Sequence, residues 1–260
     1  KKRYGNHVVL DGVTFDVHRG LTNVIVGGSG SGKTVLLRQL IRLERPDAGR
    51  IELDGQDIVP LSEVELGDVR RKFAVVFQGA ALFDSMSVYD NVAFPLREGK
   101  NKRSEASIRE SVEERLAALG VAQAKAKLPS ELSGGMRKRV AVARALVMEP
   151  DILIYDEPTT GLDPITSRAV DELIESTRQR FGVTSVVISH DVQSVSKMAH
   201  RVNLLLHGRM EVSLARDDVF ASSNPNVRQF IAASGVAIPA PTPAGSDAPG
   251  LDIGVRRRTG

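Results

Sequence analysis

The 260-residue chain contains no cysteine, and aromatic residues make up only 4% of it. Without cysteine the chain forms neither disulfides nor thiolate metal sites, and its composition fits a reducing compartment. No apolar run approaches the roughly 20 residues that a membrane-spanning helix requires, and the N-terminus shows no secretory signal pattern. These absences predict a cytoplasmic globular protein.

Aromatic residues are also missing from the most basic part of the chain. Residues 97–145 hold 12 Lys and Arg against 6 Asp and Glu, whereas the whole chain has a net charge of only +3. Such an excess usually marks a solvated face, and contact with an anionic membrane surface or protein partner is the alternative that stays open. No nucleic acid is expected as a partner, because no aromatic side chain accompanies these charges to stack on bases.

A glycine-rich loop near the N-terminus has the pattern G-x-x-x-x-G-K-[ST]. An apolar run suited to a buried strand precedes it at 21–26, and apolar residues with helical spacing follow it. In this pattern backbone N–H groups face nucleotide phosphates, the lysine reaches the β- and γ-phosphates, and the last hydroxyl ligates Mg²⁺. The loop therefore predicts binding of a nucleoside triphosphate. Its residues are Gly27, Gly28, Ser29, Gly30, Ser31, Gly32, Lys33 and Thr34.

Apolar runs typical of strands alternate with segments of helical periodicity along most of the chain. This alternation predicts an α/β fold with a largely parallel sheet and ligands at the carboxyl ends of its strands. A helical stretch interrupts it and predicts an inserted helical subdomain (85–148) within a core (1–84 and 149–233). The proline-rich end predicts a flexible C-terminal extension (234–260). The predicted strands are 13–17, 21–26, 51–53, 73–77, 152–155, 184–188 and 202–206, and the predicted helices are 104–119, 135–148, 166–180 and 192–198.

Two further patterns carry chemistry. The apolar run 152–155 leads into Asp156 and Glu157. A carboxylate at the end of such a strand holds Mg²⁺ opposite the loop hydroxyl, so Asp156 is the candidate metal ligand and Glu157 the candidate base for an attacking water. In the second pattern, Ser133-Gly134-Gly135 opens a predicted helix and offers a second anion site. Both anion sites can face one triphosphate if two chains pair head to tail.

These patterns together resemble the ATP-binding cassette (ABC) ATPases. Leu132–Met136 resembles the signature sequence of that family, and Gln78, Leu162-Asp163 and His190 stand where it has its Q-, D- and H-loops. The resemblance extends from about Tyr4 to Ala233. It implies a P-loop NTPase with a RecA-like core, and a homodimer that sandwiches two ATP molecules with Mg²⁺.

The resemblance also implies roles for single residues. Ser133 and Gly135 of one chain contact the γ-phosphate held by the other chain, Gly134 belongs to the same cofactor-binding segment, and Asp163 reaches the opposite site. Met136 replaces the glutamine that usually ends the signature, which removes a polar contact and leaves the serine and glycine contacts intact. Three further residues have roles of their own. Tyr4 stacks on adenine, and His190 bonds the γ-phosphate. Gln78 links Mg²⁺ and water to the membrane partner. Judged without the family, Tyr4 could equally be a half-exposed strand residue, and Gln78 reads as a solvent-exposed strand end.

Several stretches resemble the Mce/Mla-type lipid-transport ATPases more narrowly: 77–88, 90–98, 130–136 and 163–166, with 226–231 matching a short C-terminal helix of that group. This implies a peripheral subunit on the cytoplasmic face of a bacterial inner membrane. It would drive an integral membrane permease that works with MCE-domain lipid-binding proteins. The apolar residues that would form part of the permease groove, or pack the junction of core and subdomain, are Leu82, Phe83, Val88 and Phe94.

Two other function classes remain open at this point. An ABC importer for polar small solutes shares every catalytic motif and differs only in the stretches just named. A soluble non-transport ABC ATPase typically carries two cassettes or long coiled-coil inserts, and this chain has neither. The sequence leaves open the lipid, the direction of transport, and whether a small regulatory subunit joins the complex.

Overall fold

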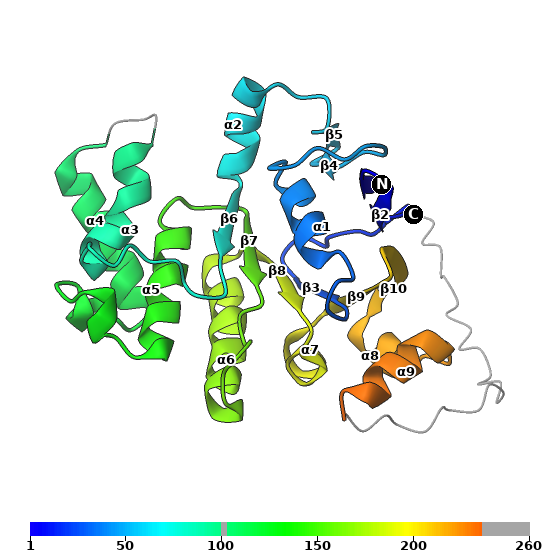
Figure 1. The fold of residues 1–260 in the computed structure, drawn as a ribbon. Helices are drawn as coiled ribbons and strands as arrows, with labels where there is room; N and C mark the ends of the chain where they lie inside the picture. The colour runs from blue at the N-terminus through cyan, green and yellow to red at the C-terminus, as the bar shows by residue number, and fades with distance from the viewer. Residues whose placement is uncertain (100–102, 236–260) are drawn as a thin grey trace, which may run out of the picture.

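The computed structural model describes residues 1–99 and 103–235, and its centre is a six-stranded sheet (Figure 1). The strand order is β10-β9-β3-β8-β7-β6, in which only β10 runs antiparallel to its neighbour. The predicted α/β fold with a largely parallel sheet is confirmed. The strands are β3 (Thr22–Val26), β6 (Phe73–Val76), β7 (Ile152–Asp156), β8 (Thr184–Ser189), β9 (Arg201–Leu206) and β10 (Arg209–Ala215).

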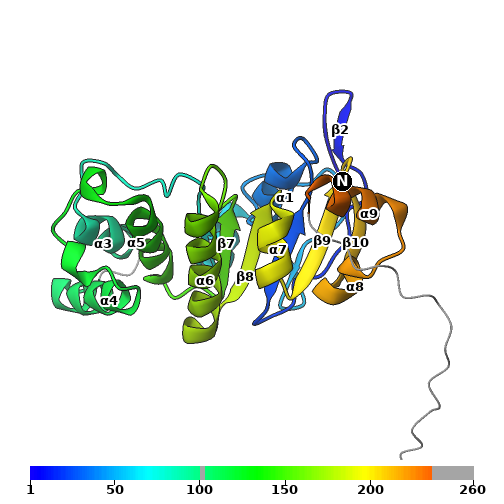
Figure 2. The same ribbon diagram turned by 90° about the horizontal axis from the view of Figure 1, so that it is seen from below.

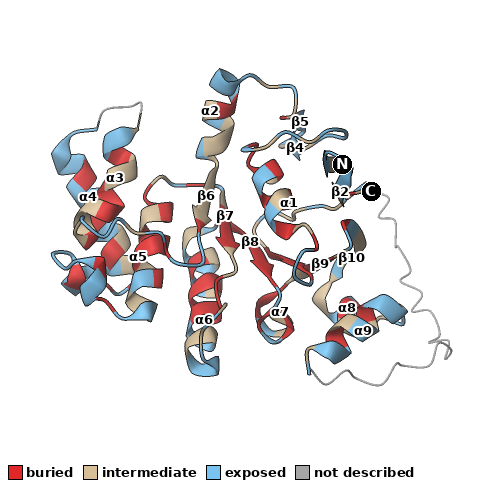
Figure 3. Cartoon of the chain, viewed as in Figure 1, coloured by how far each residue is buried: buried red, intermediate tan, exposed pale blue. Residues whose placement is uncertain are grey.

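Helices cover both faces of the sheet, which is why β3 and β8 are buried at every position (Figure 3). Successive side chains of a strand point to opposite faces, so neighbouring residues enter different cores. Ile25 shares one core cluster with Leu36 of α1, and Val24 shares the other with Ile174 of α6. The covering helices are α1 (Lys33–Leu40), α6 (Pro164–Phe181) and α7 (Val192–Met198).

A separate group of helices lies beyond the β6 edge of the sheet (Figures 1 and 2). Serine side chains start two of them: Ser87 accepts the Asp90 N–H and Ser104 accepts the Ser107 N–H. Gly120, with φ of 69°, follows the last turn of the second helix. The group comprises α3 (Val88–Glu98), α4 (Glu105–Ala118), α5 (Gly134–Leu146) and the short 3₁₀ segments at Ala122–Ala124 and Pro129–Glu131.

Short elements surround the sheet. The turn Asp54-Gly55 joins β4 to β5, and both residues have positive φ. Helix α9 confirms the short C-terminal helix expected at 226–231. No described helix is both long and apolar enough to cross a membrane. The remaining elements are β1 (Lys2–Tyr4), β2 (His7–Leu10), β4 (Glu52–Leu53), β5 (Gln56–Asp57), α2 (Glu63–Arg71), α8 (Arg216–Phe220) and α9 (Pro225–Ala233).

The predicted strand at 13–17 is wrong, because this segment forms no strand in the described part of the chain. Val13, Phe15 and Val17 nevertheless pack against the core cluster on the α1 side of the sheet. Alternation in the sequence thus identified the side chains that face the core, but a strand also needs a hydrogen-bonded neighbour. Of the predicted C-terminal extension only residues 234–235 are described, and 236–260 lie outside the described residues.

Candidate functional site

The carboxyl ends of four strands lie side by side, because β6, β7, β8 and β3 are parallel and adjacent. The register aligns them: Val26 of β3 pairs with Ser189 of β8, and Asp156 of β7 pairs with Ile188 of β8. Residues that follow these strands therefore emerge at one edge of the sheet. The predicted site residues that emerge there are Gln78, Asp156, Glu157, His190 and the loop 27–34.

The glycines of the loop between β3 and α1 fall into two kinds. A Cβ at Gly27 would lie 2.2 Å from the Leu205 carbonyl oxygen, and one at Gly32 would lie 2.8 Å from a leucine side chain. Gly32 also has φ of 103°, which disfavours other residues. At Gly28 and Gly30 a Cβ would meet nothing within 4 Å. The loop therefore packs tightly against the protein at Gly27 and Gly32, whereas Gly28 and Gly30 have free space beside them.

Lys33 is buried and turns its ammonium back onto the loop. Its Nζ donates to the carbonyl oxygens of Gly27, at 2.8 Å, and Gly28, at 3.0 Å. The same atom lies 3.7 Å from Oε1 of Glu157. Among the described residues, the buried Ser31 hydroxyl has no hydrogen-bond partner and no side chain caps the first turn of α1. Free N–H groups, an orphaned hydroxyl and a lysine at one helix N-terminus fit an anionic ligand.

The Glu157 carboxylate contacts three side chains, and its backbone N–H has a partner of its own. Its backbone is in the left-handed region, with φ of 49°, and its N–H donates to the Ile188 carbonyl oxygen at 2.9 Å. Its Oε2 accepts the Thr160 hydroxyl at 2.9 Å and lies 2.7 Å from Nδ1 of His190. Lys33 is the third partner. Sequence reasoning missed Thr160, for which the only available signal was a hydroxyl three residues beyond Glu157.

Asp156 ends β7 beside this group. Burial raises the pKa of its carboxyl, the charge of Glu157 raises that pKa further, and Lys33 partly opposes the shift. Within residues 1–99 and 103–235 the Asp156 carboxylate has no hydrogen bond or ion pair, and no cluster of three or more His, Asp and Glu forms a cage for a metal. The Thr34 hydroxyl stands exposed in the first turn of α1. An unpaired carboxylate and a hydroxyl fit a hard cation that takes its other ligands from phosphate and water.

Three predicted residues, Gln78, Ser133 and Asp163, are not bonded to the loop 27–34 within the described part of the chain. The Ser133 hydroxyl caps α5 by accepting the Met136 N–H, and the Asp163 carboxylate caps α6. Hydrogen bonding of Asp163 to Thr166 lowers the pKa of its carboxyl. Gln78 is exposed beyond β6. In the described part of the chain none of the three forms a hydrogen bond to the loop.

Tyr4 lies in the β1–β2 hairpin. Its ring is 46% exposed, its hydroxyl donates to Glu44 at 2.5 Å, and the Lys2 ammonium lies 5.4 Å from the ring centroid. The hydrogen bond to Glu44 raises the pKa of Tyr4. The ring is thus fixed in place and accessible.

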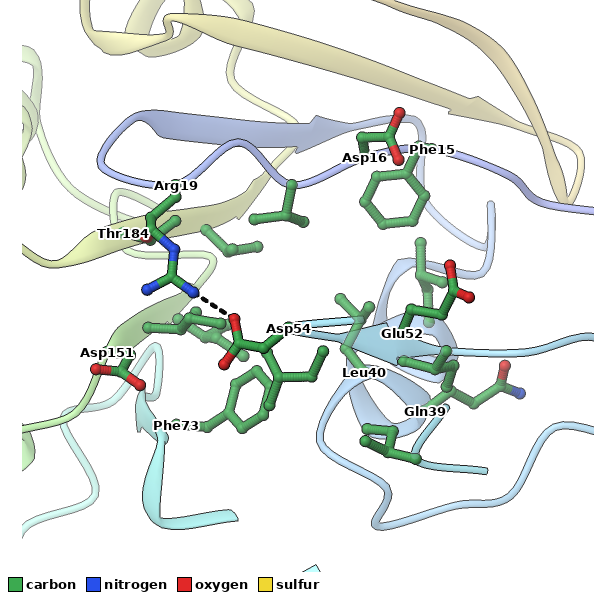
Figure 4. A pocket seen from close by; sticks show the side chains of 18 of the residues that line it. Phe15, Asp16, Arg19, Gln39, Leu40, Glu52, Asp54, Phe73, Asp151 and Thr184 are labelled. Atoms are coloured by element: carbon green, nitrogen blue, oxygen red, sulfur yellow. Dashed lines mark hydrogen bonds and ion pairs between the residues drawn. The ribbon is translucent and has the colours of Figure 1, made fainter. Parts of the chain in front are cut away.

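A cavity of about 950 Å³ lies among the segment 12–19, α1, β4 and β7 (Figure 4). Apolar residues such as Phe15, Leu40 and Phe73 line it, and Arg19 pairs with Asp54 across it. None of its lining residues belongs to the predicted site. The cavity is therefore separate from the edge of the sheet where the loop 27–34 lies.

The family model described as ABC transporter matches residues 10–160 of the chain. This chain belongs to the ABC transporter family. The cassette is 40% identical over 230 residues to the probable ribonucleotide transport ATP-binding protein mkl of Mycobacterium leprae, covering 88% of the cassette and 66% of mkl. It therefore spans just under two thirds of the length of mkl. It is also 40% identical over 244 residues to the intermembrane phospholipid transport system ATP-binding protein MlaF of Escherichia coli K12, covering 93% of the cassette and 90% of MlaF.

Solved structures agree with this assignment. The cassette resembles cbiO1 of Clostridium perfringens, part of the ABC transporter complex cbiONQ, with a TM-score of 0.79, 32% identity and coverage of 89% of the cassette and 91% of cbiO1. It also resembles the ATP-binding cassette MJ0796 in a dimeric post-hydrolysis state bound to ADP and Pi, with a TM-score of 0.71, 30% identity and coverage of 83% and 94%. The P-loop NTPase fold of ABC cassettes, predicted from the sequence, is confirmed.

Proposed function

We propose that the cassette is the ATP-hydrolysing motor of an ABC transporter that moves phospholipids or related lipids between bacterial membranes. The arrangement of Glu157 carries the hydrolytic part: a carboxylate fixed by Lys33, Thr160 and His190 beside the candidate phosphate loop. The lipid part is supported by MlaF, the relative named for intermembrane phospholipid transport. The alignment with this chain covers 90% of the length of MlaF.

ATP binds at the loop 27–34 in this proposal. The backbone N–H groups and the Ser29 and Ser31 hydroxyls surround the phosphates, and Lys33 exchanges its present carbonyl partners for phosphate oxygens. Thr34, Asp156 and Gln78 hold Mg²⁺, which when bound neutralises charge on the phosphates. The unpaired state of the Asp156 carboxylate supports its place in this set.

Glu157 is the general base for hydrolysis. Its carboxylate accepts the proton of the attacking water, and the Thr160 and His190 contacts fix the direction in which it points. When Lys33 turns to the phosphates, it leaves its 3.7 Å contact with Glu157. The carboxylate is then free to bind water. His190 then also donates to the γ-phosphate.

A homodimer completes each site. Ser133 and Gly135 of one chain contact the γ-phosphate in the other, with Gly134 between them in the same cofactor-binding segment, and Asp163 reaches across the same interface. This is supported by the absence of hydrogen bonds from Ser133 and Asp163 to the loop of their own chain in the described residues, and by the dimeric form of one structural neighbour. Tyr4, accessible and held by Glu44, stacks on adenine.

The motor acts through partners at the cytoplasmic face of the inner membrane. We assign residues 1–84 and 149–233 to the ATP-binding core and 85–148 to the helical subdomain. An integral permease docks near Phe83, which is 41% exposed and packs on Phe94 with ring centroids 4.8 Å apart. Val88 is fully buried and serves packing alone. MCE-domain proteins receive or deliver the lipid, and a small regulatory subunit is a further candidate partner.

An importer of polar solutes is the second candidate. It is favoured by mkl, which is named for ribonucleotide transport. The sequence of mkl is 40% identical to this chain, the same value as for MlaF. The lipid function is preferred because the alignment with MlaF extends over more of both chains, 93% and 90% against 88% and 66%.

Replacing the proposed base tests the hydrolytic function. Glu157→Gln keeps the size of the side chain and loses the proton acceptor, so we expect turnover to fall by about 10²-fold or more while ATP binding persists. Phosphate release and equilibrium nucleotide binding measure the two effects. Lys33→Ala is the contrasting variant, because it should weaken both binding and turnover. Near-normal turnover in Glu157→Gln would contradict the assignment.

A further inference from the structure

The loop that follows β6 has an unfavourable backbone. Ala80 has φ of 65° and Ala81 has φ of 47°, and neither is glycine, so both are in a region that L-residues rarely adopt. The strain persists only if the surroundings fix the loop. Gln78, the proposed link between Mg²⁺ and the permease, belongs to the same loop and lies two residues before Ala80.

Two cations of α5 supply part of that fixation. Lys138 is buried and its Nζ donates to the Gln78 carbonyl oxygen at 2.5 Å. Arg144 uses both arms of its guanidinium, donating from Nη1 to the Ala81 carbonyl oxygen at 2.8 Å and from Nη2 to that of Ala80 at 3.0 Å. In the described residues neither cation pairs with a carboxylate, and burial lowers the pKa of both. The loop carbonyls are therefore the compensation for burying these charges.

Helix α3 holds the next part of the loop. Asn91 is fully buried, accepts the Phe83 N–H at 2.8 Å, and donates to the carbonyl oxygens of Phe83 at 3.0 Å and Met86 at 3.1 Å. The Arg144 guanidinium also lies 5.7 Å from the centroid of the Phe83 ring. Side chains of α3 and α5 thus bond the loop from Gln78 to Met86.

We propose that Lys138 and Arg144 are positioning residues that fix the 78–81 backbone to α5, so that Gln78 and Phe83 move with the helices α3 and α5 as one body. The functional meaning of this attachment rests on the proposed role of the loop in coupling to a permease. Ser133 starts the same helix, so a displacement of α5 by nucleotide in the partner's site is passed directly to Gln78.

Amide hydrogen exchange of the nucleotide-free cassette tests the attachment. The Ala80 N–H donates to the Phe77 carbonyl oxygen at 2.9 Å and reports the turn directly. In Arg144→Lys, which keeps the charge and loses the two-armed grip, we expect the amide of Ala80 to exchange about tenfold faster, with β8 unchanged. Lys138→Met should act in the same direction at the same loop.

Arg139→Lys is the matched control, because Arg139 lies on the same helix but donates to the Leu119 carbonyl oxygen, at 3.2 Å. It should leave the loop unchanged. Unaltered exchange at Ala80 in both Arg144→Lys and Lys138→Met would overturn the proposal. So would a loop effect that appears only together with faster exchange in β8, since that is general destabilisation.

Spin labels give a second measurement, because the chain has no cysteine and introduced thiols are labelled uniquely. Exposed positions are available in the loop, at Ser85, and on α4, at Arg109. We expect a narrow distance distribution for Ser85→Cys with Arg109→Cys, and a broader one when Arg144→Lys is added. If the distance distribution of the labelled chain with Arg144 intact were as broad as that of the labelled Arg144→Lys chain, the proposed attachment would be contradicted. Neither measurement uses ATP or lipid, so failure of the proposed function would leave these results intact.

Discussion

Asp156 and Glu157 are adjacent carboxylates whose backbone conformations differ, so that their side chains have different surroundings. Asp156 continues the extended strand β7, whereas Glu157 turns into the left-handed region with φ of 49°. The turn places the Glu157 carboxylate between Lys33, Thr160 and His190, whereas the Asp156 carboxylate has no partner among the described residues. Strain at this residue is thus associated with separating a candidate metal ligand from a candidate base.

Asp171 of α6 is a buried carboxylate outside the site. Burial raises its pKa to about 6, with Asp191 and Glu172 contributing and Ser194 and Lys197 opposing. Its Oδ1 has no hydrogen-bond partner within residues 1–99 and 103–235. The pKa in the folded chain exceeds that in the unfolded chain, so the folded chain binds more protons between the two values. Stability should therefore fall as the pH rises from about 4 to about 6.

Asp171→Asn removes this ionisation. At about pH 7.5 we expect the variant to be more stable than the wild type by up to about 3 kcal/mol, and this advantage should shrink as the pH is lowered to about 4. Denaturant unfolding at both pH values measures the difference. An effect of the same size at both would show that the charge of Asp171 is not its cause.

At the scale of elements, the phosphate loop combines positions fixed by packing with positions left open for a ligand. Gly27→Ala places a Cβ against the Leu205 carbonyl oxygen, so we expect the free energy of unfolding to fall by about 2 kcal/mol or more. Gly28→Ala is the matched control, because its Cβ meets nothing, and should change stability by less than about 0.5 kcal/mol. Equal losses in thermal or denaturant unfolding would contradict this division of the loop.

Elements set by local signals could be predicted from the sequence. The run 21–26 became β3, and α4 begins after its Ser104 cap and ends before Gly120. Features that depend on distant partners could not. The segment 13–17 has the alternation of a strand but pairs with no strand in the described part of the chain. The Thr160 contact with Glu157 depends on a turn that the sequence pattern did not specify.

The basic stretch 97–145 shows the same limit. Its excess of cations favoured a solvated face or an anionic surface when only the sequence was considered. Four of these cations instead donate to backbone carbonyl oxygens of nearby loops and helix ends, which no charge count reveals. They are Arg137, Lys138, Arg139 and Arg144.

At the scale of the whole molecule, the proposed composite site requires two chains. In mixed dimers of Ser133→Arg and Lys33→Ala chains, one site carries both lesions and the other carries neither. We therefore expect mixing to restore part of the ATPase activity that each homodimer lacks, measured as phosphate release at fixed total protein. No recovery, in dimers shown to contain both chains, would contradict a site shared between subunits.

Lipid distribution in living cells tests the central claim, that hydrolysis at Glu157 drives lipid movement. The chromosomal gene is replaced by Glu157→Gln, and the phospholipid content of the two membranes is measured together with uptake of labelled lipid. We predict that Glu157→Gln disturbs the lipids as strongly as deletion of the gene and weakens the envelope barrier. Unchanged lipids, with loss of uptake of a ribonucleotide or another polar solute, would contradict the account.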